Sequence, residues 1–149
     1  MNNTEIKRIL KKYPPSEYVY RGSIHYKKRL YPRLYPVSKK QFKKIIFGTS
    51  NIYLALSYIR KPNVNEKIAQ NNSNNITLIE LTKKSFKNSL STTGFLYILD
   101  KNKFKKSKLK NLDTEYISEK IQKPIDIIKI NNPLQILKNE KSVKLLHFN

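Results

Sequence analysis

Three polar sites follow short apolar runs in this chain, and their residue types are those that bind a charged ligand. Arg21 stands after "YVY", Thr49 and Ser50 stand after "IIFG", and Asp113 and Glu115 lie at the start of "DTEYIS". In an extended segment, a spacing of two residues puts both carboxylates on one face. A cation, a hydroxyl pair and a carboxylate pair in one cleft suit a ligand with both phosphates and ribose hydroxyls.

Each site also has an ordinary structural interpretation, which the sequence leaves open. Residues 48–50 fit a turn from a strand into a capped helix. Arg21 fits a surface arginine at a point where Gly22 lets the backbone turn sharply. Glu115 fits a solvated ion pair with one of many lysines, which contributes little to stability, and Asp113 fits a turn residue.

The elements that must position these residues are short strands with few helices. The patterns predict helices at residues 1–13, at residues 51–60 and from Pro133. Strands are predicted at residues 18–22, 45–47, 76–82, 94–100, 114–118 and 123–131. The polar residues 62–75 predict a surface loop. Residues 1–149 are therefore predicted to form a single α+β domain, mostly antiparallel because few helices could link parallel strands.

The charge of the chain favours an anionic partner. Its 31 basic and 10 acidic residues give a formal net charge of +21, which attracts nucleic acid or anionic lipid at low salt. A coding bias towards lysine codons is a second explanation of part of this charge. Basic and aromatic residues that alternate could neutralise and stack single-stranded nucleic acid, or pack a Pro-rich loop on the core. These candidates are Arg29, Tyr31, Arg33 and Tyr35, with Lys105 and Lys106 further along.

Several classes of site and location are not expected from this composition. The chain has no cysteine, and its two histidines, His25 and His147, lie far apart, so no metal site is expected. No apolar stretch approaches the length of about 18 residues that a membrane span needs, so no membrane association is expected. The charged N-terminal residues lack the apolar region of a signal peptide. An intracellular, cytoplasmic protein is therefore expected.

The order of three segments resembles the motifs of the ADP-ribosyltransferases, in the branch that uses arginine, serine and glutamate. These segments are "VYRGS", "IIFGTSNIYLAL" and "DTEYIS", the last followed by Pro124 and a strand. The resemblance implies an ADP-ribosyltransferase-like fold with NAD as a substrate. It implies that Arg21, with Gly22 beside it, binds NAD, and that Thr49 and Ser50 hold the site together.

The same resemblance implies that Glu115 is catalytic. A carboxylate there would bond the nicotinamide ribose and stabilise positive charge on the sugar as the glycosidic bond breaks. Asp113 would face the acceptor, although it is one methylene shorter than the usual Glu or Gln. Gly48 stands where the family has its first serine. Tyr53 matches a tyrosine of a sister branch, which has a histidine where Arg21 stands.

The resemblance and the charge together predict NAD-dependent transfer of ADP-ribose to a macromolecular acceptor. Nucleic acid or an acidic protein bound to it would be an attractive acceptor for so basic a domain. Two alternatives from other classes stay open. One is a non-enzymatic basic protein that binds nucleic acid, and the other is a transferase-like interaction module that does no transfer.

Overall fold

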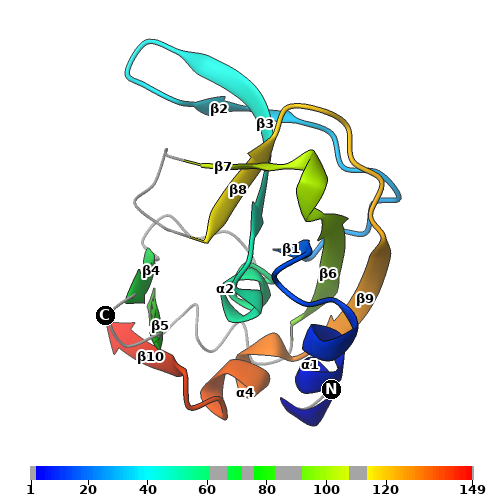
Figure 1. Cartoon of the computed structure of the whole chain (residues 1–149). Helices are drawn as coiled ribbons and strands as arrows, with labels where there is room; N and C mark the ends of the chain where they lie inside the picture. Colours follow the sequence, from blue (N-terminus) through cyan, green and yellow to red (C-terminus); the bar gives the residue numbers. More distant parts are fainter. Residues whose placement is uncertain (1–2, 61–66, 72–75, 83–91, 108–113, 149) are drawn as a thin grey trace.

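The computed structural model describes residues 3–60, 67–71, 76–82, 92–107 and 114–148. Their strands form two β-sheets, with short helices beside them (Figure 1). The helices are α1 (Asn3–Lys12), α2 (Ile52–Ser57), the 3-10 turn η1 (Lys101–Lys103) and α4 (Pro133–Lys138). The strands are β1 (Tyr18–Ser23), β2 (Arg33–Pro36), β3 (Phe42–Thr49), β4 (Lys67–Asn71), β5 (Ile76–Thr82), β6 (Thr93–Asp100), β7 (Lys105–Lys106), β8 (Glu115–Ser118), β9 (Asp126–Asn131) and β10 (Val143–Phe148).

The larger sheet has the order β7-β8-β3-β1-β6-β9, and β2 pairs with β3 beside this path. Every pairing within it is antiparallel. The smaller sheet has the order β10-β5-β4, where β5 pairs parallel with β10 and antiparallel with β4. The prediction of a small α+β domain with mostly antiparallel strands and few helices is thus confirmed.

Two apolar clusters lie on opposite faces of the larger sheet. The larger cluster joins residues of α1, α2 and α4 to alternate residues of β1 and β6, such as Tyr20, Leu96 and Ile98. The smaller cluster contains the residues between them, including Val19, Tyr97 and Leu99. Alternation along these central strands therefore buries both faces, which explains why β6 reads as a nearly continuous apolar run.

The sheet opens between its two central strands, β1 and β3. β1 pairs with β6 along six residues, whereas its pairing with β3 is limited to Tyr20 opposite Thr49. We call this opening the β1–β3 split. Gly22 lies on β1 beside the split, where a Cβ atom would stand 1.9 Å from the carbonyl oxygen of Ala55. The absence of a side chain thus lets α2 approach β1 closely.

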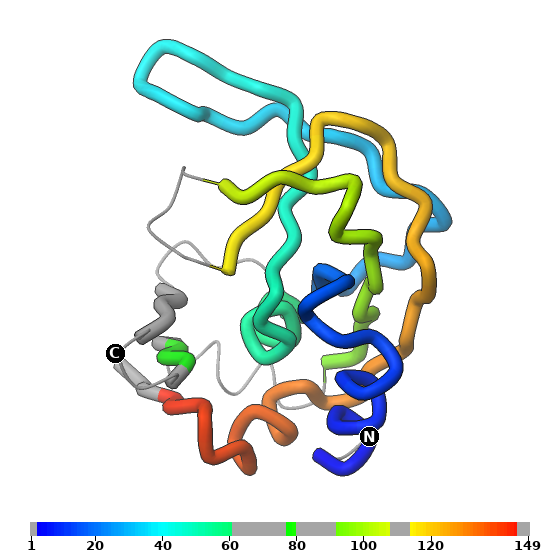
Figure 2. The backbone as a smooth tube through the Cα atoms, in the orientation of Figure 1, coloured from blue at the N-terminus to red at the C-terminus, as the bar shows by residue number. Residues whose placement is uncertain are grey.

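β2 and β3 form a hairpin that extends away from the rest of the domain (Figures 1 and 2). The β2–β3 hairpin comprises residues 33–49, and its outer part carries the exposed apolar side chains Leu34 and Phe42.

Several of the predicted elements differ from those in the structure, and two predicted strands change in extent, because β3 covers Phe42–Thr49 and β9 starts only at Asp126. Residues 67–71, predicted to belong to a surface loop, form β4, while residues 62–66 and 72–75 lie outside the described residues. The predicted helix at residues 51–60 is shorter, because α2 ends at Ser57 and Tyr58 is its C-cap. The predicted N-terminal helix is α1, at Asn3–Lys12. In the described part of the chain no helix has the length and apolar character needed to cross a membrane.

Asn51 fixes the start of α2, and we expect the Asn51→Ala variant to lose about 1–2 kcal/mol of unfolding free energy. Its Oδ1 accepts hydrogen bonds from the backbone N–H groups of Tyr53 and Leu54, and its Nδ2 donates to Thr77 Oγ1 at 2.7 Å. The variant loses the cap and the link between α2 and β5. Urea unfolding followed by circular dichroism measures the change.

The matched variant for this test is Asn51→Asp, which keeps an oxygen acceptor for both amide groups. We expect it to lose about half as much stability as Asn51→Ala. Equal losses in the two variants would show that the cap itself contributes nothing.

Candidate functional site

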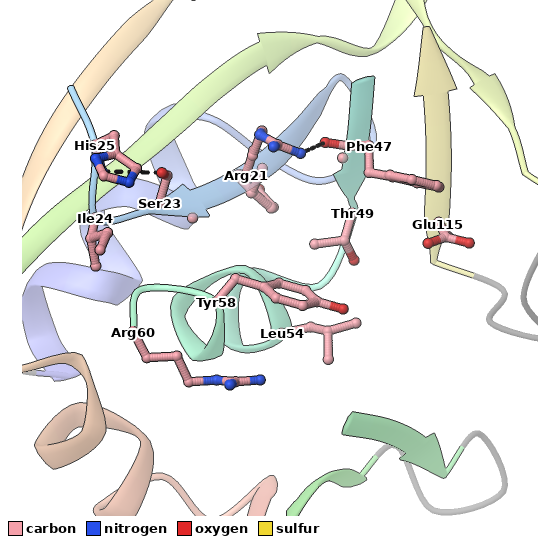
Figure 3. A pocket seen from close by; sticks show the side chains of 13 residues that line it. Arg21, Ser23, Ile24, His25, Phe47, Thr49, Leu54, Tyr58, Arg60 and Glu115 are labelled. Carbon is pink, nitrogen blue, oxygen red and sulfur yellow. Dashed lines mark hydrogen bonds between the residues drawn. The ribbon is translucent and has the colours of Figure 1, made fainter. Parts of the chain in front are cut away.

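A cavity of about 270 Å³ occupies the β1–β3 split (Figure 3). It is lined by segments that are far apart in the sequence: the end of β1 and the following loop, the end of β3, the start of β8 and the C-terminal part of α2. We call it the first cavity. Its described lining residues are Tyr20, Arg21, Gly22, Ser23, Ile24, His25, Phe47, Gly48, Thr49, Leu54, Tyr58, Arg60 and Glu115.

Sheet register brings Thr49 and Glu115 together. Tyr20 is opposite Thr49, and Thr49 is opposite Glu115, so the three residues form one row across β1, β3 and β8. Side chains directly opposite each other lie on the same face, about 5 Å apart at Cβ. Both the Thr49 and the Glu115 side chains are buried. A hydroxyl and a carboxylate from distant segments are therefore neighbours in the first cavity.

Hydrogen bonds hold the ends of β3 and β8 in this arrangement. The backbone N–H of Ser50 donates to the carbonyl oxygen of Thr114 at 2.9 Å, next to Glu115. The Thr49 hydroxyl oxygen accepts a hydrogen bond from the backbone N–H of Asn51 at 3.0 Å. Thr49 thus takes part in the turn into α2, as one sequence interpretation predicted, and its side chain also lines the cavity.

Arg21 reaches the first cavity from the other side of the sheet. It pairs with Tyr97 of β6, which belongs to the smaller apolar cluster, and alternation along β1 puts it on the face opposite to Tyr20. Its Nη1 donates to the carbonyl oxygen of Phe47 at 3.1 Å, across the β1–β3 split (Figure 3). The separation of the strands lets a side chain of one face share a cavity with residues of the other.

Burial leaves the arginine charges of this cavity poorly solvated. Burial lowers the pKa of Arg21, and the positive charge of Arg33 lowers it further. Burial also lowers the pKa of Arg60, whose Nε donates to the carbonyl oxygen of Ser57 at 2.7 Å. An anion in the cavity would restore favourable interactions that these guanidinium groups lost on burial.

Several lining residues were not among the residues that the sequence pointed to. Leu54, Tyr58 and Arg60 come from α2 and the turn after it (Figure 3), and their spacing in sequence shows only an amphipathic helix. His25 also lines the cavity, and its backbone N–H donates to Ser23 Oγ at 3.1 Å. The one signal that could have indicated the α2 residues is that the predicted helix starts directly after the Gly-Thr-Ser turn.

The remaining predicted site residues lie in different places. Gly22 lines the first cavity, and its lack of a side chain allows α2 to pack closely against β1. Ser50 is not among the lining residues, and it acts through its backbone bond to Thr114. Tyr53 packs on the larger apolar cluster, where burial, followed by the nearby Glu140, raises its pKa to about 12. Asp113 lies outside the described residues.

The residues proposed to contact nucleic acid divide into two groups. Tyr31, Arg33 and Tyr35 line a second cavity, on the side of Arg21 and Phe47 that faces the β2–β3 hairpin. Arg29 is exposed in the loop before Leu30, and Lys105 and Lys106 are exposed on β7; none of these three lines the second cavity.

A search of the described residues finds no group of three or more His, Cys, Asp or Glu side chains that could hold a metal ion. The first cavity instead offers two guanidinium groups, hydroxyl groups, aromatic rings and one carboxylate. This donor set suits a small organic ligand with anionic groups. Comparisons of the chain with protein-family models, curated proteins and solved structures find no match.

Proposed function

We propose that the chain binds NAD in the first cavity and transfers its ADP-ribose group to a macromolecular acceptor. The observation that carries this proposal is that Arg21, Thr49 and Glu115, from three distant segments, line a single cavity. These are the residues that the resemblance to ADP-ribosyltransferases assigns to binding, support and catalysis. The proposal that the fold is ADP-ribosyltransferase-like also depends on these three residues lining one cavity.

The charged side chains of the first cavity suit two parts of NAD, the pyrophosphate and the nicotinamide ribose. Arg21 and Arg60 are the cations among its described lining residues, and they would attract the pyrophosphate group of NAD. Glu115 is the acidic lining residue, and its buried carboxylate would face the nicotinamide ribose. Small-molecule sites begin at about 300 Å³, so this cavity suits the reactive half of the dinucleotide.

In the proposed reaction, the bond between the nicotinamide nitrogen and C1 of its ribose breaks. The bonding electrons stay with the ring nitrogen, so nicotinamide leaves as a neutral molecule. A nucleophile of the acceptor forms the new bond to C1 and loses its proton. Positive charge develops on the ribose between these events, and a fixed carboxylate such as Glu115 stabilises it. Tyr58, from the α2 side, would provide an aromatic surface for the nicotinamide ring.

The direct test is to incubate the purified chain with NAD and a mixture of nucleic-acid and protein acceptors. Free nicotinamide is measured by chromatography, and NAD affinity by calorimetry. We expect release above the rate without protein. We expect Arg21→Gln to bind NAD about tenfold more weakly, because it loses a charged contact of about 1.4 kcal/mol.

Arg8→Gln is the matched control, since Arg8 is an exposed arginine of α1 that lines neither the first cavity nor the adjoining one. It should bind NAD like the wild type. Circular dichroism must show the same fold in both variants, because Arg21 also bridges β1 and β3. If the wild type binds NAD without releasing nicotinamide, the chain is a binding module. If it does not bind NAD, the proposal fails.

A further inference from the structure

The second cavity has features that the proposed NAD site does not use. Its volume is about 280 Å³, and it shares Arg21, Ser23, His25 and Phe47 with the first cavity. The two cavities therefore adjoin, with the hydrogen bond from Arg21 to Phe47 between them. One wall of the second cavity is the loop after β1, and the other is the base of the β2–β3 hairpin.

The second cavity is strongly basic. Arg21, Lys27 and Arg33 line it, and none of the described residues that line it is Asp or Glu. Arg21 and Arg33 are close enough for the charge of one to disfavour the charged form of the other. An anion in the cavity would offset the repulsion between these like charges. The ligand is therefore expected to carry several negative charges.

Tyrosine rings stand among these cations. Tyr31 is 59% exposed, although an aromatic ring gains by burial, so its ring is available to a ligand. Tyr35 is half-buried, and its ring contacts Phe47 edge to face with centroids 4.6 Å apart, which fixes its position. One fixed and one available ring beside basic side chains is the combination on which single-stranded bases stack.

The β2–β3 hairpin continues this surface beyond the cavity. It projects from the domain (Figures 1 and 2), and beyond the cavity it carries exposed Lys39, Lys40, Lys43 and Lys44 as well as Phe42. Of these lysines, Lys43 lies 3.7 Å from the carboxylate of Glu119. A polymeric anion could follow both the cavity and the hairpin.

We propose that the second cavity and the β2–β3 hairpin bind single-stranded nucleic acid, with phosphates on Lys27 and Arg33 and a base on Tyr31. Because this surface adjoins the first cavity, a strand bound there would be the acceptor of ADP-ribose. The acceptor role rests on the proposed function, whereas binding of the strand does not. The net charge of +21 adds long-range attraction to this local arrangement.

The test measures binding of a fluorescent 12-nucleotide single strand by anisotropy, without NAD, over a range of salt concentrations. We expect affinity to fall steeply with salt. We expect the double variant Lys27→Glu/Arg33→Glu to bind at least about tenfold more weakly than the wild type. We expect Tyr31→Ala to bind about fivefold to a hundredfold more weakly, the effect of losing one stacked base.

Matched controls separate these effects from the overall charge. Lys7→Glu/Lys11→Glu makes the same change of charge on the exposed side of α1, far from the cavity in sequence. Tyr26→Ala removes a tyrosine that is 56% exposed and lines neither cavity. Both controls should bind the single strand with an affinity within about twofold of the wild type. If a control loses as much affinity as the site variant that it matches, the proposed binding site is wrong.

Further outcomes distinguish other occupants. Competition by NAD for the oligonucleotide would mean that the dinucleotide fills the second cavity and would overturn the proposal. Equal affinity of the wild type for the single strand and for a duplex of the same length would also overturn the proposal. The same holds if the Lys27→Glu/Arg33→Glu variant binds the single strand like the wild type but binds anionic lipid vesicles more weakly. If the strand binds as expected and nicotinamide is not released, the proposed transfer fails while the binding site is supported.

Discussion

Replacing Glu115 by glutamine should lower the rate of nicotinamide release by about 10²–10³-fold. The amide has nearly the shape of the carboxylate but no negative charge, so it cannot stabilise positive charge on the ribose. Glu115 is buried and lies beside Thr49 in the sheet. A fixed charge in a site with little water acts more strongly than the same charge in solvent.

The loss should appear in the rate of the chemical step and leave NAD affinity within about threefold, because the carboxylate acts mainly on the transition state. Glu119→Gln is the matched control, since Glu119 lies just after the same strand and is exposed. Its carboxylate lies 3.7 Å from Lys43 on the surface, a pair that contributes little. Equal release by the wild type and the Glu115→Gln variant would end the enzymatic interpretation.

Replacing Gly22 by alanine should lower the free energy of unfolding by about 3 kcal/mol. The new Cβ would stand 1.9 Å from the carbonyl oxygen of Ala55 and 3.0 Å from Ile59 Cγ1. The first of these contacts is with backbone, so α2 must move away from β1 to relieve it. Because Leu54, Tyr58 and Arg60 lie on or after α2, this movement would also widen the first cavity and weaken NAD binding.

Gly48→Ala provides the comparison, because it inserts the same methyl group in the neighbouring strand. Its Cβ would meet Val19 Cγ2 at 3.0 Å and Val19 Cβ at 3.3 Å, so this side chain must move by only a few tenths of an ångström, whereas Gly22→Ala collides with backbone at 1.9 Å. We expect a change of less than about 1 kcal/mol, since alanine also restricts the unfolded chain. Urea unfolding followed by circular dichroism compares the two. A Gly22→Ala variant as stable as Gly48→Ala would contradict this account of the packing.

Local patterns predicted most elements of the larger sheet because each pattern depends on neighbouring residues. The apolar run at residues 94–100 corresponds to β6, and Pro133 does begin a helix. The same reasoning missed β4, since residues 67–71, which lie within a mostly polar stretch, form a strand by pairing with β5. It gave no sign of the parallel pairing between β5 and β10, which joins segments far apart in the chain.

The candidate site shows the same division. The order of short motifs pointed to Arg21, Thr49 and Glu115, and all three line the first cavity. Tyr53 was indicated by its match to a tyrosine of a sister branch, yet its position on α2 turns it towards the larger apolar cluster. Leu54, Tyr58 and Arg60, which line the first cavity from α2 and the turn after it, belong to no sequence motif that would have pointed to a site. A helix surface becomes part of a site only through the element that it packs against.

The sequence by itself determined the types of side chain, their order, the large positive charge and the elements on which they stand. These depend on composition and on periodicities of two or about four residues. Only the tertiary structure decided that Arg21 and Glu115 share a cavity, because alternation places Arg21 on the sheet face opposite to the row of Tyr20, Thr49 and Glu115. The separation of β1 from β3 lets both faces open into one site, and that separation depends on contacts between strands remote in sequence.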